Sequence, residues 1–344
     1  MSALQFELPH RLEAHEPPEA RGLARDEVRL LVARKRTGHV AHAQFRDLPA
    51  FLAPGDLVVV NASATLPAAL PGRLADGSDV ELRLSTAVPH RAPERWRIVE
   101  LRDGERPFLG ARTGDVVSLP DDARAELVAP YAGSRRLWLA RLELSQPFSS
   151  YLEQHGHPIR YGYVPTEWPL ALYQNVYADE PGSAEMASAG RPFTTDLITR
   201  LVAHGIHVAP IVLHTGVSSP ERNEPPYAET YRVPEGTARL VNAVHGWGGR
   251  VIAVGTTVVR ALETVAQQDG TVVAGEGWTN LVVCAECGVR TVDGLITGWH
   301  EPEASHLQML QALAQEEILE KSYRAALDHG YLWHEFGDSH LILP

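Results

Sequence analysis

The sequence predicts an α/β fold in two domains, with an α/β domain that is interrupted by an inserted small antiparallel β-barrel. Two observations carry this prediction. Strand and helix patterns alternate in residues 1–62 and return in residues 148–344, whereas residues 63–147 hold only short alternating runs divided by turns. We therefore expect the two outer segments to form one discontinuous α/β domain and the middle segment to form the barrel.

The first outer segment contains two strand patterns and one short helix pattern. An apolar run from Val28 to Val32 predicts a strand, and Thr37-Gly38 predicts a turn after it. A short helix is expected from Phe45 to Leu52. A second strand is expected from Leu57 to Val60, because the turn sequence Pro54-Gly55-Asp56 precedes it.

The middle segment alternates between apolar and polar residues from Leu66 to Leu144. Its runs are LPGRLADGSDVELRLSTAV, RWRIVELRDG, DVVSLPDDARAELVAP and RRLWLARLELS. Asp-Gly, Gly-Asp and proline turns divide them, which is typical of an antiparallel sheet or small barrel.

The second outer segment returns to strand and helix. TTDLITRLVAHG predicts a helix with Thr195 as its N-cap and Gly205 as its end, and IHVAPIVLHTG predicts a buried strand. GGRVIAVGTTVVRALETVAQQDG predicts a strand, a tight turn and a helix. SHLQMLQALAQEEILEKSYRAALDHG predicts one amphipathic helix that ends before Gly330.

Composition narrows the class of protein. The 344 residues correspond to two domains of the usual size of roughly 100–200 residues. The chain is 44% hydrophobic and 22% charged, with no membrane-spanning run and no signal-peptide pattern, so we expect a cytoplasmic protein without a membrane partner. Its net charge of −12 fits small-molecule chemistry at least as well as nucleic-acid binding, although a local basic patch would suffice for the latter.

The two cysteines, Cys284 and Cys287, form a lone CxxC motif. Two cysteines exclude a disulfide scaffold, and a single pair makes a zinc ribbon improbable. We expect two thiols at the end of a strand. No histidine spacing in the chain indicates a metal site, so no metal is expected.

The stretch VIAVGTTVVR, residues 251–260, is the best-defined candidate for binding a ligand. A strand that ends in Gly255-Thr256-Thr257 at a helix start offers free N–H groups, two hydroxyls and the positive end of the helix dipole. An ordinary capped helix is an equal alternative on this pattern alone. The motifs GxxxxGK[ST] and GxGxxG are absent.

Several side chains near strand ends could carry chemistry. His214 and His300 each end an apolar run, where ligands of open α/β sheets bind, but a histidine satisfied by local backbone is as plausible. Four carboxylates in nearby loops could act as bases or bind a cation, although such groups are more often solvated charges, and three tyrosines could stack on a ligand, although packing is their more frequent role. The carboxylates are Glu185, Glu229, Asp293 and Glu301, and the tyrosines are Tyr173, Tyr177 and Tyr231.

Nearly the whole chain resembles one enzyme family, the S-adenosylmethionine:tRNA ribosyltransferase-isomerases of queuosine biosynthesis. The resemblance rests on YQNVYADEPGSAEMASAGRPFT, APIVLHTG, AETYRV, GGRVIAVGTTVVRALE, VDGLITGWHEP and FGDSHLIL, and on the N-terminal segment from Arg25 to Asn61. It implies an α/β domain with an inserted β-barrel, as the pattern predicts. It also implies S-adenosylmethionine as cosubstrate and tRNA as partner.

The implied reaction transfers the ribosyl part of S-adenosylmethionine to 7-aminomethyl-7-deazaguanine in tRNA and rearranges it, giving epoxyqueuosine-tRNA, adenine and methionine. The sulfonium acidifies the adjacent 5′ carbon, so a positioned base can start the elimination of adenine. From the resemblance we expect His214, Glu229 and His300 to be catalytic. The expected substrate-binding residues are Tyr173, Gln174, Tyr177, Gly182, Ser183, Glu185, Gly190, Arg191, Phe193, Thr194, Tyr231, Gly255, Thr256, Thr257, Arg260 and Asp293.

The chain also departs from the family pattern. Asn61-Ala62-Ser63-Ala64 stands where the family usually has Asn-Asp-Thr-Arg, and Glu303 stands where it has a lysine. Replacing a positive by a negative charge near a phosphate backbone weakens RNA binding. Glu185, Met186 and Arg191 would then adapt the loop to a different or differently held acceptor.

Three functions therefore stay open at this point. The first is the tRNA-modifying transferase-isomerase, and the second is a paralogue that uses the same adenine elimination with a small-molecule acceptor. The third is a nucleoside-binding protein without catalysis, against which the retained His214, Glu229 and His300 argue.

Overall fold

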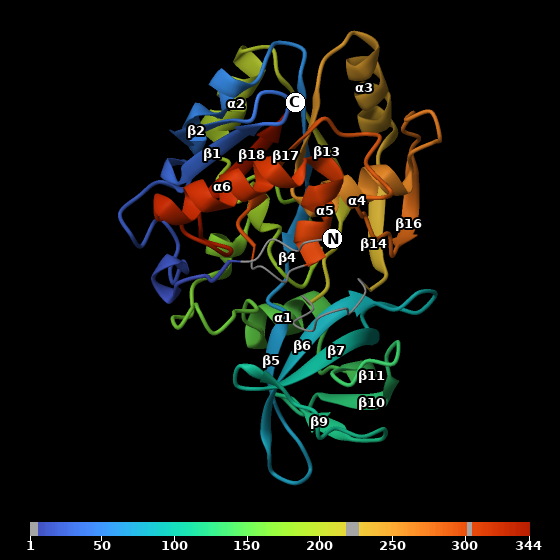
Figure 1. Cartoon of the computed structure of the whole chain (residues 1–344). Coiled ribbons are helices and arrows are strands. Elements are labelled where there is room, and N and C mark those ends of the chain that lie inside the picture. The colour runs from blue at the N-terminus through green and yellow to red at the C-terminus, as the bar shows by residue number, and fades with distance from the viewer. Residues whose placement is uncertain (1–5, 218–226, 301–304) are drawn as a thin grey trace.

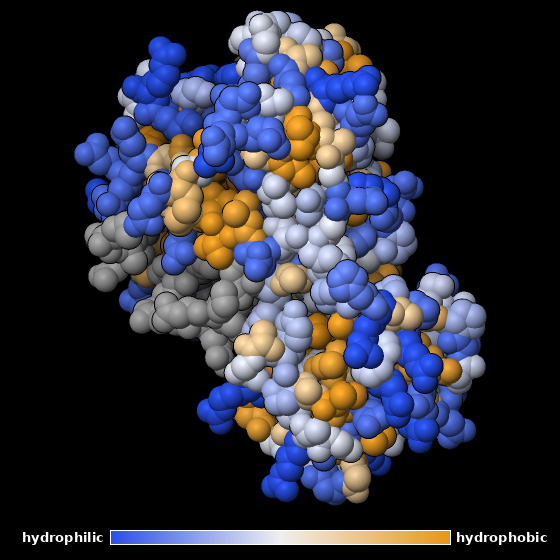
Figure 2. All heavy atoms as spheres, turned by 90° about the vertical axis from the view of Figure 1, so that its right-hand side faces the viewer, coloured by the Kyte–Doolittle hydropathy of each residue, from blue (hydrophilic) through white to orange (hydrophobic). Residues whose placement is uncertain are grey.

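The computed structural model describes residues 6–217, 227–300 and 305–344. Figure 1 shows a sheet with helices in the upper part and a barrel in the lower part. The space-filling view of Figure 2 shows these parts as a larger and a smaller body, with hydrophilic residues separating small hydrophobic patches. The predicted class, an α/β protein with an inserted antiparallel barrel, is confirmed.

The large sheet has nine strands in the order β16-β14-β13-β3-β15-β17-β18-β1-β2. Its central strands β13, β3, β15 and β17 are parallel to one another. Strands β14 and β18 flank them and run antiparallel to them, and β1 pairs in parallel with β18. The strands are β1 (Arg29–Arg34), β2 (His39–Gln44), β3 (Leu57–Asn61), β13 (His207–Leu213), β14 (Glu229–Val233), β15 (Val251–Val254), β16 (Gly275–Thr279), β17 (Gly294–Gly298) and β18 (Ser339–Leu343).

Helices cover both faces of this sheet, because its central strands are apolar on both sides. In β3, Leu57 and Val59 pack in one core with α3, α4 and α6, whereas Val58 and Val60 pack in the opposite core with α2 and η3. The helices are α1 (Phe148–His155), α2 (Thr195–Ala203), α3 (Glu235–Gly246), α4 (Thr256–Thr264), α5 (Ser305–Leu313) and α6 (Glu316–Asp328). The 3₁₀ helices are η1 (His10–Leu12), η2 (Arg25–Glu27), η3 (Phe45–Phe51), η4 (Leu170–Tyr173) and η5 (Ser188–Gly190).

The second sheet closes into a six-stranded antiparallel barrel, because its strand β11 pairs with both β10 and β7. The strands are β5 (Ala69–Arg73), β6 (Asp79–Ala87), β7 (Trp96–Asp103), β9 (Val116–Ser118), β10 (Arg124–Pro130) and β11 (Leu137–Glu143), and β8 (Arg106–Pro107) extends the edge of β7. Tyr151 and Leu152 of α1 pack in the barrel core, so α1 lies against the barrel although the sequence places it in the outer segment. The proposed domain boundary at residues 147–148 stays a prediction.

A short parallel strand pair joins the two parts. Strand β4 (Ser63–Thr65) leads into the barrel, and β12 (Glu180–Ser183) pairs with it as the chain returns. Figure 1 shows β4 between the upper sheet and the barrel.

Two details of the helix predictions need correction. The predicted single helix over residues 305–330 is two helices, because Gln315 has an extended backbone (ψ 147°) and Glu316 and Glu317 begin a new first turn, where acidic side chains stabilise the helix dipole. The N-cap of α2 is Thr194 rather than Thr195, since the Thr194 side chain accepts a hydrogen bond from the Leu197 N–H.

Candidate active site

The carboxyl ends of the four parallel strands lie on one edge of the large sheet. Asn61 ends β3, His214 follows β13, Gly255 follows β15, and His300 lies two residues beyond β17. This is the edge at which open α/β sheets bind ligands. The structure therefore brings the predicted His214, His300 and Gly255-Thr256-Thr257 to the same edge.

His214 is held by contacts from two segments of the chain, β4 and β12. Its Nδ1 lies 2.8 Å from Ser63 Oγ, and its Nε2 lies 3.6 Å from a carboxylate oxygen of Glu180. Ser63 Oγ is also 2.6 Å from Ser183 Oγ. Gly182 packs directly against the imidazole, where a Cβ atom would overlap the ring.

Burial lowers the pKa of His214, and the positive charges of Arg97 and Arg232 lower it further, while Glu180 acts in the opposite direction. The imidazole is therefore neutral near pH 7, with one ring nitrogen able to accept a proton. A neutral, partly buried imidazole suits a general base.

Asn61 connects the strand ends to the helix α4. Its side-chain oxygen accepts hydrogen bonds from the N–H groups of Ser63 (3.1 Å) and Leu213 (3.0 Å). Its amide donates to the Leu213 carbonyl (2.8 Å) and to Thr257 Oγ1 (3.3 Å). The buried Asn61 side chain thus fixes the position of the backbone that carries Ser63 and His214.

Gly255 begins α4 with a backbone conformation (φ +85°) that favours glycine. Thr256 and Thr257 form the first helical positions, and both are partly exposed. The first N–H groups of α4 accordingly point toward the strand-end edge, as the sequence predicts for a ligand-binding turn.

Glu229 is paired on both carboxylate oxygens. One accepts a hydrogen bond from the Gly216 N–H at 2.9 Å, and the other forms an ion pair with Arg260. Both side chains are largely buried, with 12% of each exposed. In this arrangement Glu229 and Arg260 hold the loop after β13 against α4, which makes Glu229 a weaker candidate for the initiating base than His214.

His300 lies at the same edge but far from His214. Its Nε2 is 3.0 Å from Thr297 Oγ1, and its carbonyl accepts from Trp333 Nε1 at 3.4 Å. Three strand spacings separate β13 from β17, or about 14 Å. The strands that precede the two histidines are therefore not neighbours in the sheet.

Part of the loop from Gly182 to Ile198 packs internally rather than toward the strand-end edge. Arg191 is buried and forms an ion pair with Glu19 at 2.7 Å, and Phe193 packs edge-on to Phe45. Glu185 accepts a hydrogen bond from the Tyr161 hydroxyl, and Thr194 Oγ1 donates to Asp26.

Gly190 and three neighbouring residues of the predicted site also have internal roles. Gly190 leaves room for the Tyr177 hydroxyl, which a Cβ would overlap. Gln174 exchanges hydrogen bonds with the backbone of Thr65, and Tyr173 packs on Phe336. The substrate-binding roles expected for these residues stay predictions.

Tyr231 pairs with Leu213 in the sheet, next to His214, whereas Asp293 lies away from this cluster. Tyr231 packs beside Gly275 and Gly277 of β16. Asp293 precedes β17, so it lies at the opposite edge of the sheet, where it accepts a hydrogen bond from the Val251 N–H at 2.8 Å and pairs with His245 at 3.3 Å. The structure does not bring Asp293 together with His214.

The expectation of two free thiols at a strand end is wrong. Cys284 and Cys287 form a disulfide within a turn, with their Cα atoms 5.3 Å apart. The turn hydrogen bond from the Cys287 N–H to the Cys284 carbonyl brings the side chains together. Glu301 and Glu303 lie outside the described residues.

A cavity of about 220 Å³ opens beside His214 at the junction between sheet and barrel. It is lined by His214, Pro181, Gly182, Thr230, Thr86, Ala87, Pro93 and Arg97. Thr86 and Arg97 are barrel residues that the sequence analysis did not single out. They are more than a hundred residues from His214 in the chain, and no local motif marks them.

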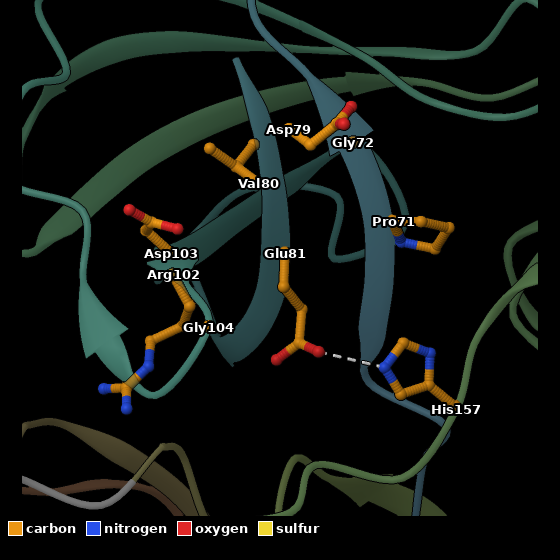
Figure 3. Close-up of a pocket in the computed structure, with 9 residues that line it drawn as sticks. All are labelled: Pro71, Gly72, Asp79, Val80, Glu81, Arg102, Asp103, Gly104 and His157. Atoms are coloured by element: carbon orange, nitrogen blue, oxygen red, sulfur yellow. Dashed lines mark hydrogen bonds and ion pairs between the residues drawn. The ribbon is translucent and has the colours of Figure 1, made fainter.

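A larger hollow of about 370 Å³ lies on the barrel and contains none of the predicted site residues. Figure 3 shows Glu81 facing His157 there, at 3.0 Å. Glu81 also pairs with Arg83 at 2.5 Å, so its charge is compensated within the protein. The hollow carries no group that resembles catalytic machinery.

The described residues offer neither a metal-binding cluster nor a membrane-spanning helix. In residues 6–217, 227–300 and 305–344, no group of three or more histidine, cysteine or acidic side chains is arranged to hold a metal ion. None of the described helices has the length and apolar character needed to cross a bilayer.

These features define a class: an α/β protein with a polar site at the carboxyl edge of a parallel sheet, next to an inserted closed barrel. The chain belongs to the family of queuosine biosynthesis proteins, whose model matches residues 1–342. The resemblance inferred from the sequence is thereby confirmed.

Relatives with full-length similarity carry one name, S-adenosylmethionine:tRNA ribosyltransferase-isomerase. The protein of Symbiobacterium thermophilum is 36% identical over 100% of this chain and 99% of its own. That of Moorella thermoacetica is 37% identical over 98% of both. A crystal structure of S-adenosylmethionine tRNA ribosyltransferase from Thermotoga maritima is similar with a TM-score of 0.54 and 28% identity, covering 99% of this chain and 100% of that one.

Proposed function

We propose that this chain is an S-adenosylmethionine-dependent ribosyltransferase-isomerase that acts on 7-aminomethyl-7-deazaguanine in tRNA. The products would be epoxyqueuosine-tRNA, adenine and methionine. The full-length similarity to relatives named for this activity favours it over a small-molecule paralogue or a non-catalytic binder. A tRNA substrate would place the enzyme in the cytoplasm.

The single observation that carries the proposal is the neutral His214 at the carboxyl edge of the sheet, held by Ser63 and backed by Gly182. The sulfonium of the cosubstrate makes the protons on its 5′ carbon acidic and makes methionine a neutral leaving group. In this proposal His214 would accept such a proton, and the lowered pKa of its imidazole supports this role because it favours the unprotonated form.

The other residues of the edge would orient the substrates. The N–H groups and hydroxyls of Gly255-Thr256-Thr257 would hydrogen-bond the ribose of the cosubstrate. His300 follows β17, which is three strands from β13, and it would contact another part of the substrates. Glu229 and Arg260 would keep the loop after β13 in place.

The test is a reaction with purified protein, S-adenosylmethionine and tRNA that carries the deazaguanine base. We expect adenine release and a tRNA nucleoside of the mass of epoxyqueuosine, both absent without S-adenosylmethionine. If adenine is released but the tRNA stays unchanged, the result would instead support a paralogue that uses a small-molecule acceptor. Binding of S-adenosylmethionine without adenine release would support a non-catalytic nucleoside-binding protein.

A further inference from the structure

Arg97 of β7 differs from the other buried arginines of the described residues. Arg83 pairs with Glu81, Arg102 and Arg136 pair with Glu100, and Arg191 pairs with Glu19. Arg97 is equally buried, with 7% of its surface exposed, yet no described carboxylate lies within ion-pair distance. Because a buried charge is costly without a partner, this arrangement indicates a ligand that supplies the negative charge.

The guanidinium of Arg97 has no hydrogen-bond acceptor among the described residues. Its Nε is buried without a partner, and its carbon lies 4.7 Å from the ring centre of Phe148. Burial lowers the pKa of Arg97 to about 10, with Glu94 acting in the opposite direction, so the side chain is still charged at pH 7. Arg97 lines the same cavity as His214, with Arg97 on the barrel side and His214 on the side of the large sheet.

A second polar group in the same cavity also lacks a partner. Thr86 Oγ1 is buried with no hydrogen bond in the described structure, and Thr86 lines the cavity. The pairing of β6 with β7 shifts between Leu84 and Ala87, so β6 has one extra residue there. Such bulges redirect side chains, and this one lies where β6 meets β14 of the large sheet.

We propose that Arg97 and Thr86 form the subsite for the α-carboxylate of the amino-acid part of S-adenosylmethionine, an inference that rests on the function proposed above. A guanidinium and a hydroxyl are complementary to a carboxylate, which accepts several hydrogen bonds. The cosubstrate would then extend from Arg97 past His214, with its ribose toward Gly255-Thr256-Thr257. This direction places its sulfonium region beside the proposed base.

A phosphate of the tRNA is the less favourable occupant. The cavity is about 220 Å³ and contains a single cation, whereas a phosphate backbone binds along a series of positive charges.

The test compares S-adenosylmethionine with its decarboxylated analogue by titration calorimetry on the full chain. For the wild type we expect the analogue to bind about 10–100-fold more weakly, which is the usual loss for a charged hydrogen-bonded group. Arg97→Met should weaken S-adenosylmethionine binding by about the same factor and leave binding of the analogue unchanged. Thr86→Val should weaken the binding of S-adenosylmethionine less, by about 3–10-fold, and should also leave the binding of the analogue unchanged.

Arg95→Met is the matched control, because Arg95 is an exposed arginine two residues away and should leave both affinities unchanged. Arg97→Met should unfold no more easily than the wild type, since it removes an unpaired buried charge. Retained binding of the analogue shows that the variant is folded.

The outcomes separate this inference from the proposed function. If the wild type does not bind S-adenosylmethionine, the proposed function fails. If the wild type distinguishes the two compounds and Arg97→Met distinguishes them equally well, the carboxylate subsite is elsewhere and the inference is overturned. Loss of tRNA binding by Arg97→Met with unchanged S-adenosylmethionine binding would overturn it in favour of a phosphate contact.

Discussion

Ser63 Oγ lies 2.8 Å from His214 Nδ1, although the two residues are 151 positions apart in the chain. Ser63 begins the strand that leads into the barrel, and His214 directly follows a central strand of the large sheet. This contact therefore couples the candidate base to the connection between the two parts. It also gives a role to a position at which the chain departs from the usual family sequence.

Removing the His214 imidazole should abolish most of the chemistry. We expect His214→Gln to reduce the rate of adenine release by about 10²–10⁴-fold, the usual contribution of a general base. His39→Gln, at an exposed position of β2, is the control and should retain the wild-type rate. An undiminished rate in His214→Gln would remove His214 from the mechanism.

The pH dependence of the reaction should reflect the lowered pKa of His214. A base works in its unprotonated form, so activity that depends on His214 is retained as the pH falls and is lost only below the ordinary histidine value of about 6.5. We expect the acidic limb of kcat/KM for adenine release to lie below pH 6.5. An acidic limb above that value would assign it to another group.

The rate of adenine release should depend on the hydroxyl group of Ser63 more than on the size of its side chain. Ser63→Ala removes the partner of Nδ1, and we expect a loss of about tenfold in kcat, equivalent to one hydrogen bond of ~1.4 kcal/mol. Ser63→Thr keeps the hydroxyl and should retain most of the rate. Equal rates in the two variants would show that the hydrogen bond does not position the imidazole.

Gly182 should tolerate no side chain. Alanine at this position would place a Cβ against the His214 ring, and we expect Gly182→Ala to lower adenine release and to cost about 1–3 kcal/mol in the free energy of unfolding measured with urea. Gly236→Ala is the control, because its Cβ in α3 would meet no atom within 4 Å. That substitution should stabilise the protein by about 0.5–1 kcal/mol.

His340 should make the protein sensitive to acid. It is fully buried beside Trp299, neither ring nitrogen has a partner among the described residues, and burial lowers its pKa to about 3. In the unfolded chain His340 binds a proton below about pH 6.5, whereas in the folded chain it does so only near pH 3. Protonation therefore favours the unfolded chain between these values, and the free energy of unfolding falls as the pH falls through that interval.

The measurement is the free energy of unfolding of His340→Leu and wild type at pH 8, 5.5 and 4.5. Between the two acidic values the wild type should lose up to about 1.4 kcal/mol per pH unit more than the variant. At pH 8 His340 is neutral in both the folded and the unfolded chain, so its protonation does not affect the free energy of unfolding there. Parallel curves throughout would contradict the burial of a neutral His340.

The sequence predicts those structural elements that are determined by residues close together in the chain. The alternation in residues 66–144 predicts the barrel because each strand has one side in its core, and VIAVGTT predicts the turn at Gly255 because a glycine follows an apolar strand. The break at Gln315 was missed because no glycine or proline marks it. There the acidic first turn of α6 outweighs the continuous apolar pattern.

Contacts between distant segments could not be predicted in this way. Arg191 looked suited to an external partner, but its carboxylate is Glu19, supplied by the N-terminal segment. Likewise Thr86 and Arg97 reach His214 only because the closed barrel places β6 and β7 against the large sheet. Neither pairing has a signature in spacing or composition.

The β4–β12 pair has a mechanical consequence. Any rotation of the barrel that widened the entrance for a folded RNA would have to bend this ribbon, and its residues Ser63 and Ser183 form the hydrogen-bonded pair next to His214. Such a bend would also displace Ser63, the hydrogen-bond partner of the imidazole, so the orientation of His214 depends on how the barrel sits against the sheet.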